Sequence, residues 1–458
     1  MARTRLVVIG GDAAGMSAAS QARRRRPASD LEILAFERGP HTSYSACGLP
    51  YYAGGVVDDW HRLIARTPAQ FAEQDIDART GHQVEEVDLV AGRVRVRNLA
   101  AGRTFDEPWD VLVVATGSEP TRPPLPGIDL PGVHSLSILQ DGIDLRQAVD
   151  AKPARAVVIG GGYIGLEAAE ALVYRGVPTS LVEQGPEVMG SVDADMGALV
   201  GQALREAGVE VFTDEKVEAI EGDTRVRAVR TAARTLPADL VVLGLGTRPA
   251  TRLAREAGIT IGQTGAIVVG PRMRTPHEGV WAAGDCVETR HLVSGAPVNY
   301  HLGTIANKQG RVCGVNLGGG YATFPGALGT AVTQIWPVEV ARTGLSEAEL
   351  APLGLQYETV SVDSTTRAGY FPGAAPIRTK VIAERRSGRL LGAQIVGREG
   401  AAKRIDVFAT ALWNRMTVDD MVHLDLSYAP PFAPVWDPVL ISVRKLSERI
   451  EDTLRDCR

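Results

Sequence analysis

The residue best suited to chemistry is a cysteine in a segment of small and turn-forming residues. Cys47 lies within residues 43–52, ten residues after Glu37 and directly before a glycine. A helix N-terminus and a nearby flavin or cation lower a thiol pKa from about 8.5 towards roughly 3.5–7.5. The resulting thiolate can attack a disulfide. The structural alternative is a packed cysteine, because free cysteine is among the most buried residue types.

The remaining cysteines limit what Cys47 can do. Cys286, Cys313 and Cys457 are distant from it in the sequence, and no pair has C-x-x-C spacing. The partner sulfur must therefore come from a substrate, or the cysteine must cycle through sulfenic acid. We interpret the other three cysteines as structural or surface residues. The eight histidines show no ligand spacing, so we predict no metal site.

Two glycine-rich turns about 150 residues apart are expected to bind nucleotides. They span residues 10–15 and 160–165. Each follows a short apolar strand, precedes an alanine-rich helix and leads to a strand ending in an acid, Glu37 or Glu183. In such units the glycines let the backbone approach a pyrophosphate, the helix N-terminus attracts it, and the acid accepts hydrogen bonds from a ribose. Two such units imply two nucleotide-binding domains.

The two turns differ in their middle position. In the second turn, Gly160, Gly162 and Gly165 complete the G-x-G-x-x-G pattern, and no arginine or lysine directly follows Glu183. Because this carboxylate repels a 2′-phosphate, NADH is favoured over NADPH. In the first turn Asp12 replaces the middle glycine, which puts a side chain near the expected pyrophosphate. The alternative for that turn is a Rossmann fold without a ligand.

Further buried strands must support these turns. Residues 111–117 and 240–246 are apolar runs that end in glycine, and residues 280–285 end in a glycine–acid pair. After about residue 326 the pattern changes. Residues 378–384 and 390–396 flank a Ser-Gly turn, which predicts a hairpin.

A helix is predicted after this hairpin. Ile405, Phe408, Leu412 and Met416 have helical spacing. The last third of the chain is therefore predicted to be an antiparallel α+β domain.

Length and charge bound the remaining possibilities. The 458 residues correspond to about three domains, and the net charge of −5 gives no electrostatic reason to expect nucleic acid. No apolar run approaches the roughly 20 residues of a membrane span, and the N-terminal run is too short for a signal peptide. We therefore expect a cytoplasmic protein whose isolated thiols remain reduced.

Together these elements resemble the flavoprotein pyridine nucleotide–disulfide reductases, specifically their single-cysteine branch. The most specific parts are residues 43–52 and 428–438, and the similarity covers essentially the whole chain. The resemblance implies an α/β fold with two Rossmann-type domains, for FAD and NAD, and a C-terminal α+β dimerisation domain. The expected boundaries are 1–118 and 246–325 for the FAD domain, 119–245 for the NAD(P)H domain and 326–458 for dimerisation. The resemblance therefore also implies that the protein is a homodimer.

The resemblance also implies roles for individual residues. Tyr370 and Tyr428 would reach the partner subunit's active site and protonate or stabilise the leaving thiolate; the alternative is a pair of ordinary interface aromatics. Tyr163 would cover the flavin until nicotinamide displaces it, and Glu167 would orient the nicotinamide. The expected cofactor-binding residues are Gly10, Gly15, Glu37, Ser43, Ala115, Thr116, Gly117, Gly160, Gly162, Tyr163, Gly165, Glu167, Glu183, Gly246, Gly284 and Asp285.

Substrate contacts are expected at a basic run and a nearby loop. Arg23, at the start of the run 23–26, or its neighbours would meet the phosphates of a coenzyme A nucleotide, with Arg66 and Thr67 bordering the same site. The alternative is a solvated basic helix end, favoured by the helix dipole.

The predicted function is FAD-dependent reduction of a low-molecular-weight disulfide by NAD(P)H through a mixed disulfide on Cys47. Peroxidase and oxidase members carry a histidine inside the first turn, where this chain has Ala13 and Ala14, so both are disfavoured. Coenzyme A disulfide is the favoured substrate, and coenzyme A persulfide or polysulfide is second. The chain ends at residue 458, where some persulfide reductases carry an extra domain. This slightly favours the disulfide over the persulfide as the expected substrate. Alternatives are an NADH oxidase, an electron-transfer flavoprotein in which Cys47 does not bond substrate, and a nucleotide-sensing scaffold.

Overall fold

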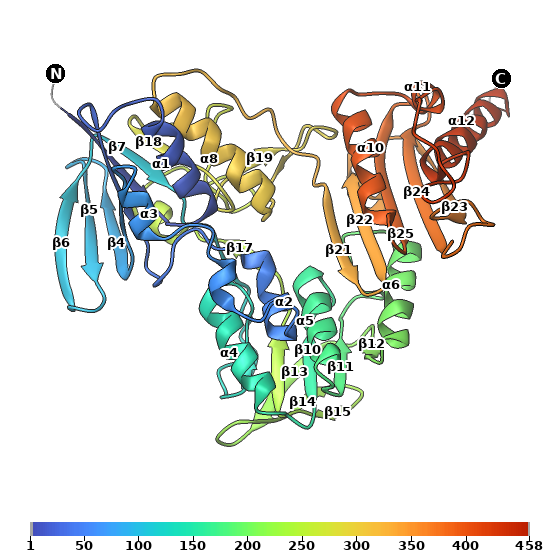
Figure 1. The fold of residues 1–458 in the computed structure, drawn as a ribbon, viewed down its shortest axis with the longest axis horizontal. Coiled ribbons are helices and arrows are strands. Elements are labelled where there is room, and N and C mark those ends of the chain that lie inside the picture. The colour runs from blue at the N-terminus through green and yellow to red at the C-terminus, as the bar shows by residue number, and fades with distance from the viewer. Residues whose placement is uncertain (1–2, 457–458) are drawn as a thin grey trace.

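The first nucleotide-binding domain is built on a five-stranded parallel sheet with the order β18-β7-β1-β2-β3. The computed structural model describes residues 3–456, so Cys457 lies outside the described residues. The strands are β1 (Thr4–Ile9), β2 (Leu31–Phe36), β3 (Asp77–Arg79), β7 (Val111–Val114) and β18 (Val280–Ala282). The sheet thus combines two distant segments of the chain, drawn in blue and yellow in Figure 1.

Both faces of this sheet are covered, which explains its uninterrupted apolar strands. Leu6 and Val8 point into a core shared with helices α1 (Ala13–Arg23) and α8 (Gly303–Leu317). Val7 and Ile9 point into the opposite core, which includes side chains of a three-stranded antiparallel sheet. That sheet is formed by β4 (His82–Asp88), β5 (Arg93–Asn98) and β6 (Arg103–Pro108).

The second nucleotide-binding domain repeats this parallel design with the order β12-β11-β10-β16-β9. Its strands are β9 (Val133–His134), β10 (Ala156–Ile159), β11 (Thr179–Val182), β12 (Glu210–Phe212) and β16 (Leu240–Leu243). Its helices are α4 (Leu139–Asp150), α5 (Tyr163–Tyr174) and α6 (Ala194–Glu206), and its antiparallel sheet is β13 (Val217–Gly222), β14 (Val226–Thr231) and β15 (Thr235–Pro237). It lies at the bottom of Figure 1.

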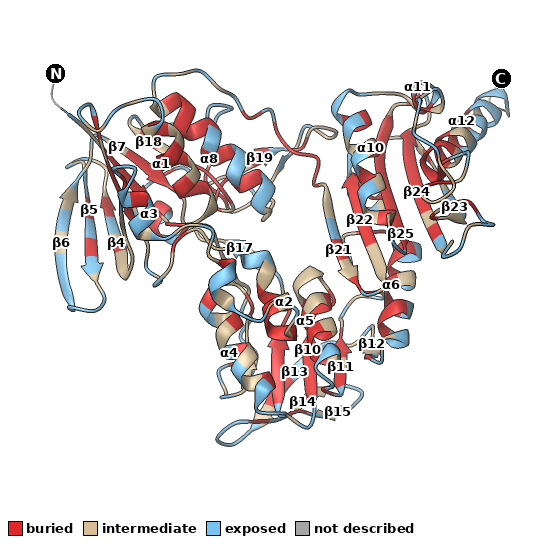
Figure 2. Cartoon of the chain, in the orientation of Figure 1, coloured by how far each residue is buried: buried red, intermediate tan, exposed pale blue. Residues whose placement is uncertain are grey.

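The C-terminal domain contains a five-stranded antiparallel sheet with the order β21-β22-β25-β24-β23. Its strands are β21 (Ala331–Ile335), β22 (Val338–Gly344), β23 (Tyr357–Thr365), β24 (Pro376–Glu384) and β25 (Leu390–Gly397), and its helices are α9 (Glu347–Leu350), α10 (Ala401–Trp413), α11 (Val418–Val422) and α12 (Pro438–Asp456). Figure 2 shows that the middle of this sheet is buried under its helices.

Short elements connect these domains and line the site. They are the 3-10 turns η1 (Ala46–Gly48), η2 (Trp60–Leu63) and η3 (Ala351–Leu353), the helices α2 (Leu49–Gly54), α3 (Pro68–Ala72) and α7 (Arg252–Glu256), and the two-stranded pairs β8 (Ser118–Pro120) with β17 (Thr247–Pro249) and β19 (Thr289–Arg290) with β20 (Pro297–Val298).

The predicted fold class, two Rossmann-type domains plus a C-terminal α+β domain, is confirmed by these sheets. The predicted hairpin corresponds to β24 and β25, which pair antiparallel. The predicted helix is α10, but it ends at Trp413. Met416 lies beyond it because Arg415 adopts a left-handed backbone conformation.

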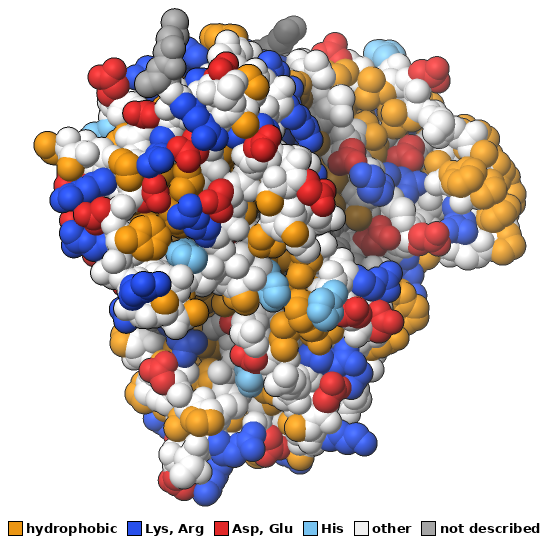
Figure 3. All heavy atoms as spheres, turned by 60° about the vertical axis from the view of Figure 1, so that its left-hand side comes forward, with side chains coloured by type: hydrophobic (Ala, Val, Ile, Leu, Met, Phe, Trp, Pro, Cys, Tyr) orange, Lys and Arg blue, Asp and Glu red, His pale blue; other side chains and the backbone are white. Residues whose placement is uncertain are grey.

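Exposed apolar side chains gather on the C-terminal domain. Figure 3 shows a hydrophobic patch on the projection at its right-hand edge. The exposed large apolar side chains of this domain between residues 370 and 436 are Tyr370, Trp413, Tyr428, Phe432, Val435 and Trp436. An apolar surface of this kind typically marks a protein interface. Within residues 3–456, every helix is too short or too polar to cross a membrane.

Candidate functional site

Cys47 lies in η1, at the entrance of α2, and its side chain is exposed and free. Backbone hydrogen bonds hold its segment on both sides. The Ser43 N–H donates to the carbonyl of Gly11, 3.0 Å away, and the Ser45 N–H donates to Leu63, 2.8 Å away. Ser43 itself adopts a left-handed conformation with φ 47°. The first glycine turn thus fixes the segment that presents the thiol.

Acidic groups from distant segments surround this thiol. The groups that act on it are Glu167 of the second nucleotide-binding domain, then Asp285 and Asp12 of the first. Burial, followed by the Glu167 charge, raises the pKa of Cys47 above its usual value. The sequence led us to expect a lowered pKa. The described residues have the opposite effect, because partial burial and the negative charges of these carboxylates disfavour the thiolate.

The first glycine turn is tied to the strand-end acid. Glu37 accepts hydrogen bonds from the N–H of Gly11 at 2.8 Å and from the N–H of Gly39 at 2.7 Å. Gly10 has φ 109°, and a Cβ there would lie 2.1 Å from the Ala115 carbonyl oxygen. The turn is therefore rigid.

The Asp12 side chain contacts the segment that carries Cys47. Its carboxylate turns towards the Cys47 segment and accepts a hydrogen bond from the Tyr44 N–H at 3.2 Å. Burial, with the Glu37 and Asp285 charges, raises the pKa of Asp12 to about 6.

The remaining residues expected around the first cofactor cluster at the carboxyl ends of β7 and β18. Thr116 and Gly117 directly follow Ala115, and the Thr116 hydroxyl donates to the Ala250 carbonyl at 2.7 Å. Asp285 accepts a hydrogen bond from Ser118 at 3.1 Å. Ligands bind at this edge of a parallel sheet. Gly284 lets the Asp285 turn approach α1, since a Cβ on Gly284 would lie 2.8 Å from the Cβ of Ala14. Gly15, in α1, packs in the same way against the Gly10 carbonyl.

The second glycine turn repeats this arrangement. Glu183 accepts hydrogen bonds from the N–H of Gly161 at 2.6 Å and from the N–H of Gly185 at 2.7 Å. A Cβ on Gly160, where φ is 103°, would lie 2.4 Å from the Gly244 carbonyl oxygen, and one on Gly165 would lie 1.9 Å from the Gly160 carbonyl oxygen.

The middle glycine of the second turn borders open space. A Cβ on Gly162 would meet no atom within 4 Å, so a phosphate can approach the backbone here. A Cβ on Gly246, which follows β16, would also point into open space. These residues fit a dinucleotide.

Two side chains of α5 near this turn, Tyr163 and Glu167, were predicted to act at the nicotinamide. The hydroxyl of Tyr163 is buried without a hydrogen-bond partner. Glu167 accepts a hydrogen bond from the Thr333 hydroxyl at 2.9 Å, and burial raises its pKa. Sequence reasoning missed Thr333, because β21 gives no sign of reaching the second nucleotide-binding domain.

A groove of about 470 Å³ leads to the Cys47 segment. It is lined near the thiol by Asp12, Ser43, Tyr44 and Ser45. Its cationic residues are Arg24, Arg66 and Arg311. Arg66 was predicted as a substrate contact, whereas Arg311, on α8, was missed because only the fold brings it beside α1.

Arg23 and Thr67 do not line this groove. The Arg23 guanidinium donates to the carbonyls of Arg26 at 3.1 Å, Leu31 at 2.8 Å and Asp75 at 2.8 Å. These bonds engage both terminal nitrogens of Arg23 within the chain itself, and its neighbour Arg24 lines the groove. The Thr67 side chain caps α3 by accepting from the Gln70 N–H.

Tyr370 and Tyr428 lie together on the C-terminal domain, away from the residues that act on Cys47. Both side chains are exposed, and a hydrogen bond to Tyr370 raises the pKa of Tyr428. Their loops are joined where the Ala368 N–H donates to Pro430 at 3.1 Å.

The other described cysteines are unsuited to redox chemistry with a substrate. Cys286 and Cys313 are free and fully buried, and burial raises the pKa of both thiols. Among residues 3–456, no three histidine, cysteine or acidic side chains form a cluster that could hold a metal ion.

Two dinucleotide-binding domains that contribute side chains around one exposed thiol define a nucleotide-dependent thiol oxidoreductase. The family comparison agrees. The chain matches the pyridine nucleotide-disulphide oxidoreductase model over residues 4–310 and the dimerisation domain of the same family over residues 330–438. The chain therefore belongs to the pyridine nucleotide-disulphide oxidoreductases and is an NAD(P)H-dependent flavoprotein reductase, as the sequence predicted.

Individual relatives are similar over nearly all of this chain and over most of their own length. A CoA-dependent NAD(P)H sulfur oxidoreductase of Pyrococcus abyssi is 39% identical over 96% of this chain and 98% of its own. The structure of a NAD-dependent persulfide reductase from A. fulgidus is 40% identical, with TM-score 0.95, over 98% of this chain and 84% of its own. Reduced Bacillus anthracis CoADR-RHD is 34% identical, with TM-score 0.95, over 99% of this chain and 81% of its own.

Gly162 and Gly160 provide a matched test of the second turn. Gly162→Ala should leave the thermal midpoint unchanged but weaken NADH binding at least tenfold, because the methyl group occupies the space open to the phosphate. Gly160→Ala should lower the thermal midpoint by several degrees, because φ is 103° and the Gly244 carbonyl is too close. Equal loss of stability in the two variants would contradict this assignment.

The raised pKa of Asp12 predicts a pH-dependent stability. The folded state holds this proton up to about pH 6, whereas the unfolded state releases it near pH 3.8. Stability therefore falls as the pH rises through this window, by up to about 3 kcal/mol. Asp12→Asn, which keeps an acceptor for Tyr44, should raise the thermal midpoint at pH 7 and leave it unchanged near pH 4. Parallel pH profiles for the two proteins would contradict the prediction.

Proposed function

We propose that this chain forms a homodimeric FAD enzyme that uses NADH to reduce a low-molecular-weight disulfide, with coenzyme A disulfide favoured. One observation carries the proposal: an exposed, free Cys47 stands on a segment that is hydrogen-bonded to the first glycine turn. The described cysteines other than Cys47 are buried, which favours a substrate as the source of the second sulfur of a redox-active disulfide.

The groove beside Cys47 suits a thiol that carries phosphates. Arg24, Arg66 and Arg311 supply three guanidinium groups, which bind phosphate oxygens through bidentate hydrogen bonds. The same groove extends to Ser45, two residues before the thiol. Coenzyme A combines a phosphorylated nucleotide with a thiol on a long arm. The Pyrococcus abyssi relative is described as CoA-dependent, which supports this choice.

The sulfur chemistry of this proposal balances as a thiol–disulfide exchange. The Cys47 sulfur attacks one sulfur of the substrate, forms a mixed disulfide and releases the first thiol. An electron pair and a proton then cleave the mixed disulfide, releasing the second thiol and restoring Cys47. When bound, FAD would transfer this electron pair from NADH to sulfur.

The chain's own residues would hold the cofactors and control their access. Glu37, Ser43, the 115–117 turn, Gly284 and Asp285 would surround FAD. The second glycine turn and Glu183 would bind NADH in preference to NADPH, because the carboxylate repels a 2′-phosphate.

Access to the flavin would depend on α5. Tyr163 would cover the flavin until nicotinamide displaces it. Glu167, held by Thr333, would orient the nicotinamide.

The partner subunit would complete the site. The pair Tyr370 and Tyr428 is exposed on its own subunit, and the family's dimerisation domain matches residues 330–438. In a homodimer these phenols would approach the partner's thiol and protonate the leaving thiolate. Phenol and thiol pKa values are close enough for this transfer.

A second candidate substrate is a coenzyme A persulfide or polysulfide. It is favoured by the names of two relatives, the CoA-dependent sulfur oxidoreductase and the persulfide reductase. The same exchange at Cys47 applies, with hydrogen sulfide in place of the released thiol. Comparing kcat/KM for coenzyme A disulfide, coenzyme A persulfide and oxygen separates the candidates. An oxidase would show its highest value with oxygen.

Cys47→Ser tests the proposed role of the thiol. The variant should lose at least a thousandfold of its coenzyme A disulfide turnover, because serine cannot form the mixed disulfide. It should retain flavin reduction by NADH, followed by flavin absorbance in a stopped-flow instrument. Cys313→Ala, at a buried cysteine, is the control and should retain turnover. Undiminished disulfide turnover in Cys47→Ser would contradict the proposal.

A further inference from the structure

The loop of residues 187–193, which connects β11 to α6, lies against the second glycine turn. The Met189 N–H donates to the Gly161 carbonyl at 2.7 Å, and Met189 adopts a left-handed conformation with φ 59°. A Cβ on Gly161 would lie 2.9 Å from the Val188 side chain. Further along the loop, Ser191 faces the Tyr163 hydroxyl. The position of Tyr163 therefore depends on this loop.

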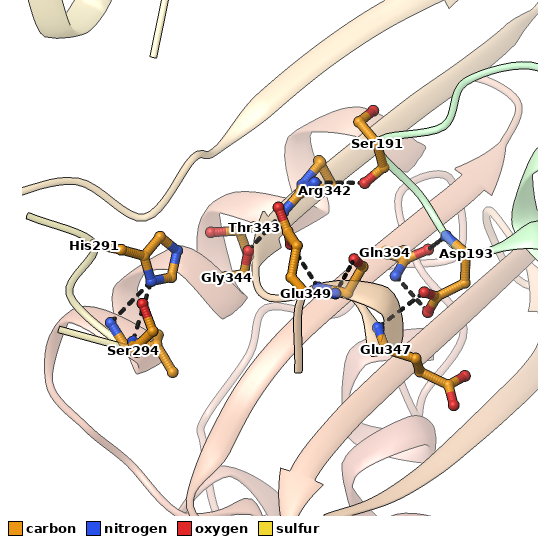
Figure 4. Close-up of polar contacts among 12 residues, drawn as sticks. Ser191, Asp193, His291, Ser294, Arg342, Thr343, Gly344, Glu347, Glu349 and Gln394 are labelled. Carbon is orange, nitrogen blue, oxygen red and sulfur yellow. Dashed lines mark hydrogen bonds and ion pairs between the residues drawn. The ribbon is translucent and has the colours of Figure 1, made fainter. Parts of the chain in front are cut away.

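The dimerisation domain holds one end of the loop through Asp193 (Figure 4). The Asp193 N–H donates to the Gln394 amide oxygen at 2.8 Å, and its carboxylate accepts from Gln394 at 2.7 Å and from the Glu347 N–H at 2.9 Å. Lys380 lies 3.1 Å from the same carboxylate. Asp193, Gln394 and Lys380 are all buried, so these bonds are shielded from water.

Arg342 holds the loop at a second point, next to Ser191. Its guanidinium donates to the Ser191 carbonyl, to the Gly344 carbonyl at 2.7 Å and to the Glu349 carboxylate at 2.7 Å. Arg342 is buried, and its planar fork satisfies all three acceptors at once. Figure 4 shows Arg342 between Ser191 and Glu349.

Tyr163 is not itself held by a hydrogen bond. The Tyr163 hydroxyl faces that of Ser191, but no well-formed hydrogen bond joins the two buried groups. The resting position of the ring therefore depends on packing against the loop, and the loop depends on Arg342 and Asp193.

We propose that Arg342 is a positioning residue, by which the dimerisation domain fixes the 187–193 loop and with it the resting position of Tyr163. The inference rests on the proposed role of Tyr163 as the ring that nicotinamide displaces. Tyr163 and nicotinamide compete for the same position over the flavin. A looser 187–193 loop makes the resting position of Tyr163 less stable, so NADH displaces the ring more easily and binds more tightly.

The test compares Arg342→Lys with Tyr163→Ala and the double variant in the holoenzyme. Lysine keeps the charge beside Glu349 but cannot hold three acceptors. Hydrogen exchange should become at least tenfold faster at the amides of Met189 and Asp193 in Arg342→Lys. The Kd for NADH, from the concentration dependence of stopped-flow flavin reduction, should fall about fivefold in each single variant. The double variant should match Tyr163→Ala, because one ring mediates both effects.

Two further variants serve as a second test and as a control. Gln394→Ala removes the hold on Asp193 and should reproduce the exchange and Kd changes if Arg342→Lys does not fold. Arg385→Lys is the matched control, because Arg385 pairs with buried Glu358 inside the dimerisation domain. It should leave both quantities unchanged.

Three results would overturn the inference: unchanged exchange at 187–193, weaker NADH binding in Arg342→Lys, or additive effects in the double variant. Failure of the proposed disulfide chemistry would be seen separately, as absent disulfide turnover in the unmodified enzyme while the NADH measurements stand.

Discussion

The site depends on one repeated interaction, a strand-end carboxylate that holds a glycine turn by two backbone N–H groups. Glu37 does this in the first nucleotide-binding domain and Glu183 in the second, with all four hydrogen bonds between 2.6 and 2.8 Å. Each turn is thereby rigid while its remaining backbone stays available to a ligand. The first turn also accepts the hydrogen bond that fixes Ser43, so the same constraint positions the segment that carries Cys47.

The chain surrounds its thiol with acids rather than with cations. Glu167, Asp285 and Asp12 come from three distant segments, and together with burial they disfavour the thiolate. Under the proposed function, the bound cofactor and substrate would therefore have to activate the sulfur, while the chain holds the thiol in position. The three domains share this work, because Thr333 of the dimerisation domain holds Glu167.

Much of the fold was predictable, because strand, turn and acid recur at fixed spacing in both nucleotide-binding domains and each signal is local. The side-chain directions were less accessible. Arg23 and Arg24 are neighbours in one basic run, yet the first turns inward to three carbonyls and the second faces the groove. Only the packing of α1 beside residue 75 and of α8 beside α1 separates them. Contacts between domains, such as Thr333 with Glu167 and Arg342 with Ser191, leave no local pattern in the sequence.

The proposed reaction depends on a covalent bond between the Cys47 sulfur and a small thiol. Intact-mass spectrometry of the purified enzyme, oxidised with coenzyme A disulfide and then treated with NADH, tests it most directly. We expect a single adduct with the mass of coenzyme A, mapped to Cys47 by peptide analysis and removed on adding NADH. A protein whose mass does not change while it turns over the disulfide, or an adduct on another residue, would contradict the central claim.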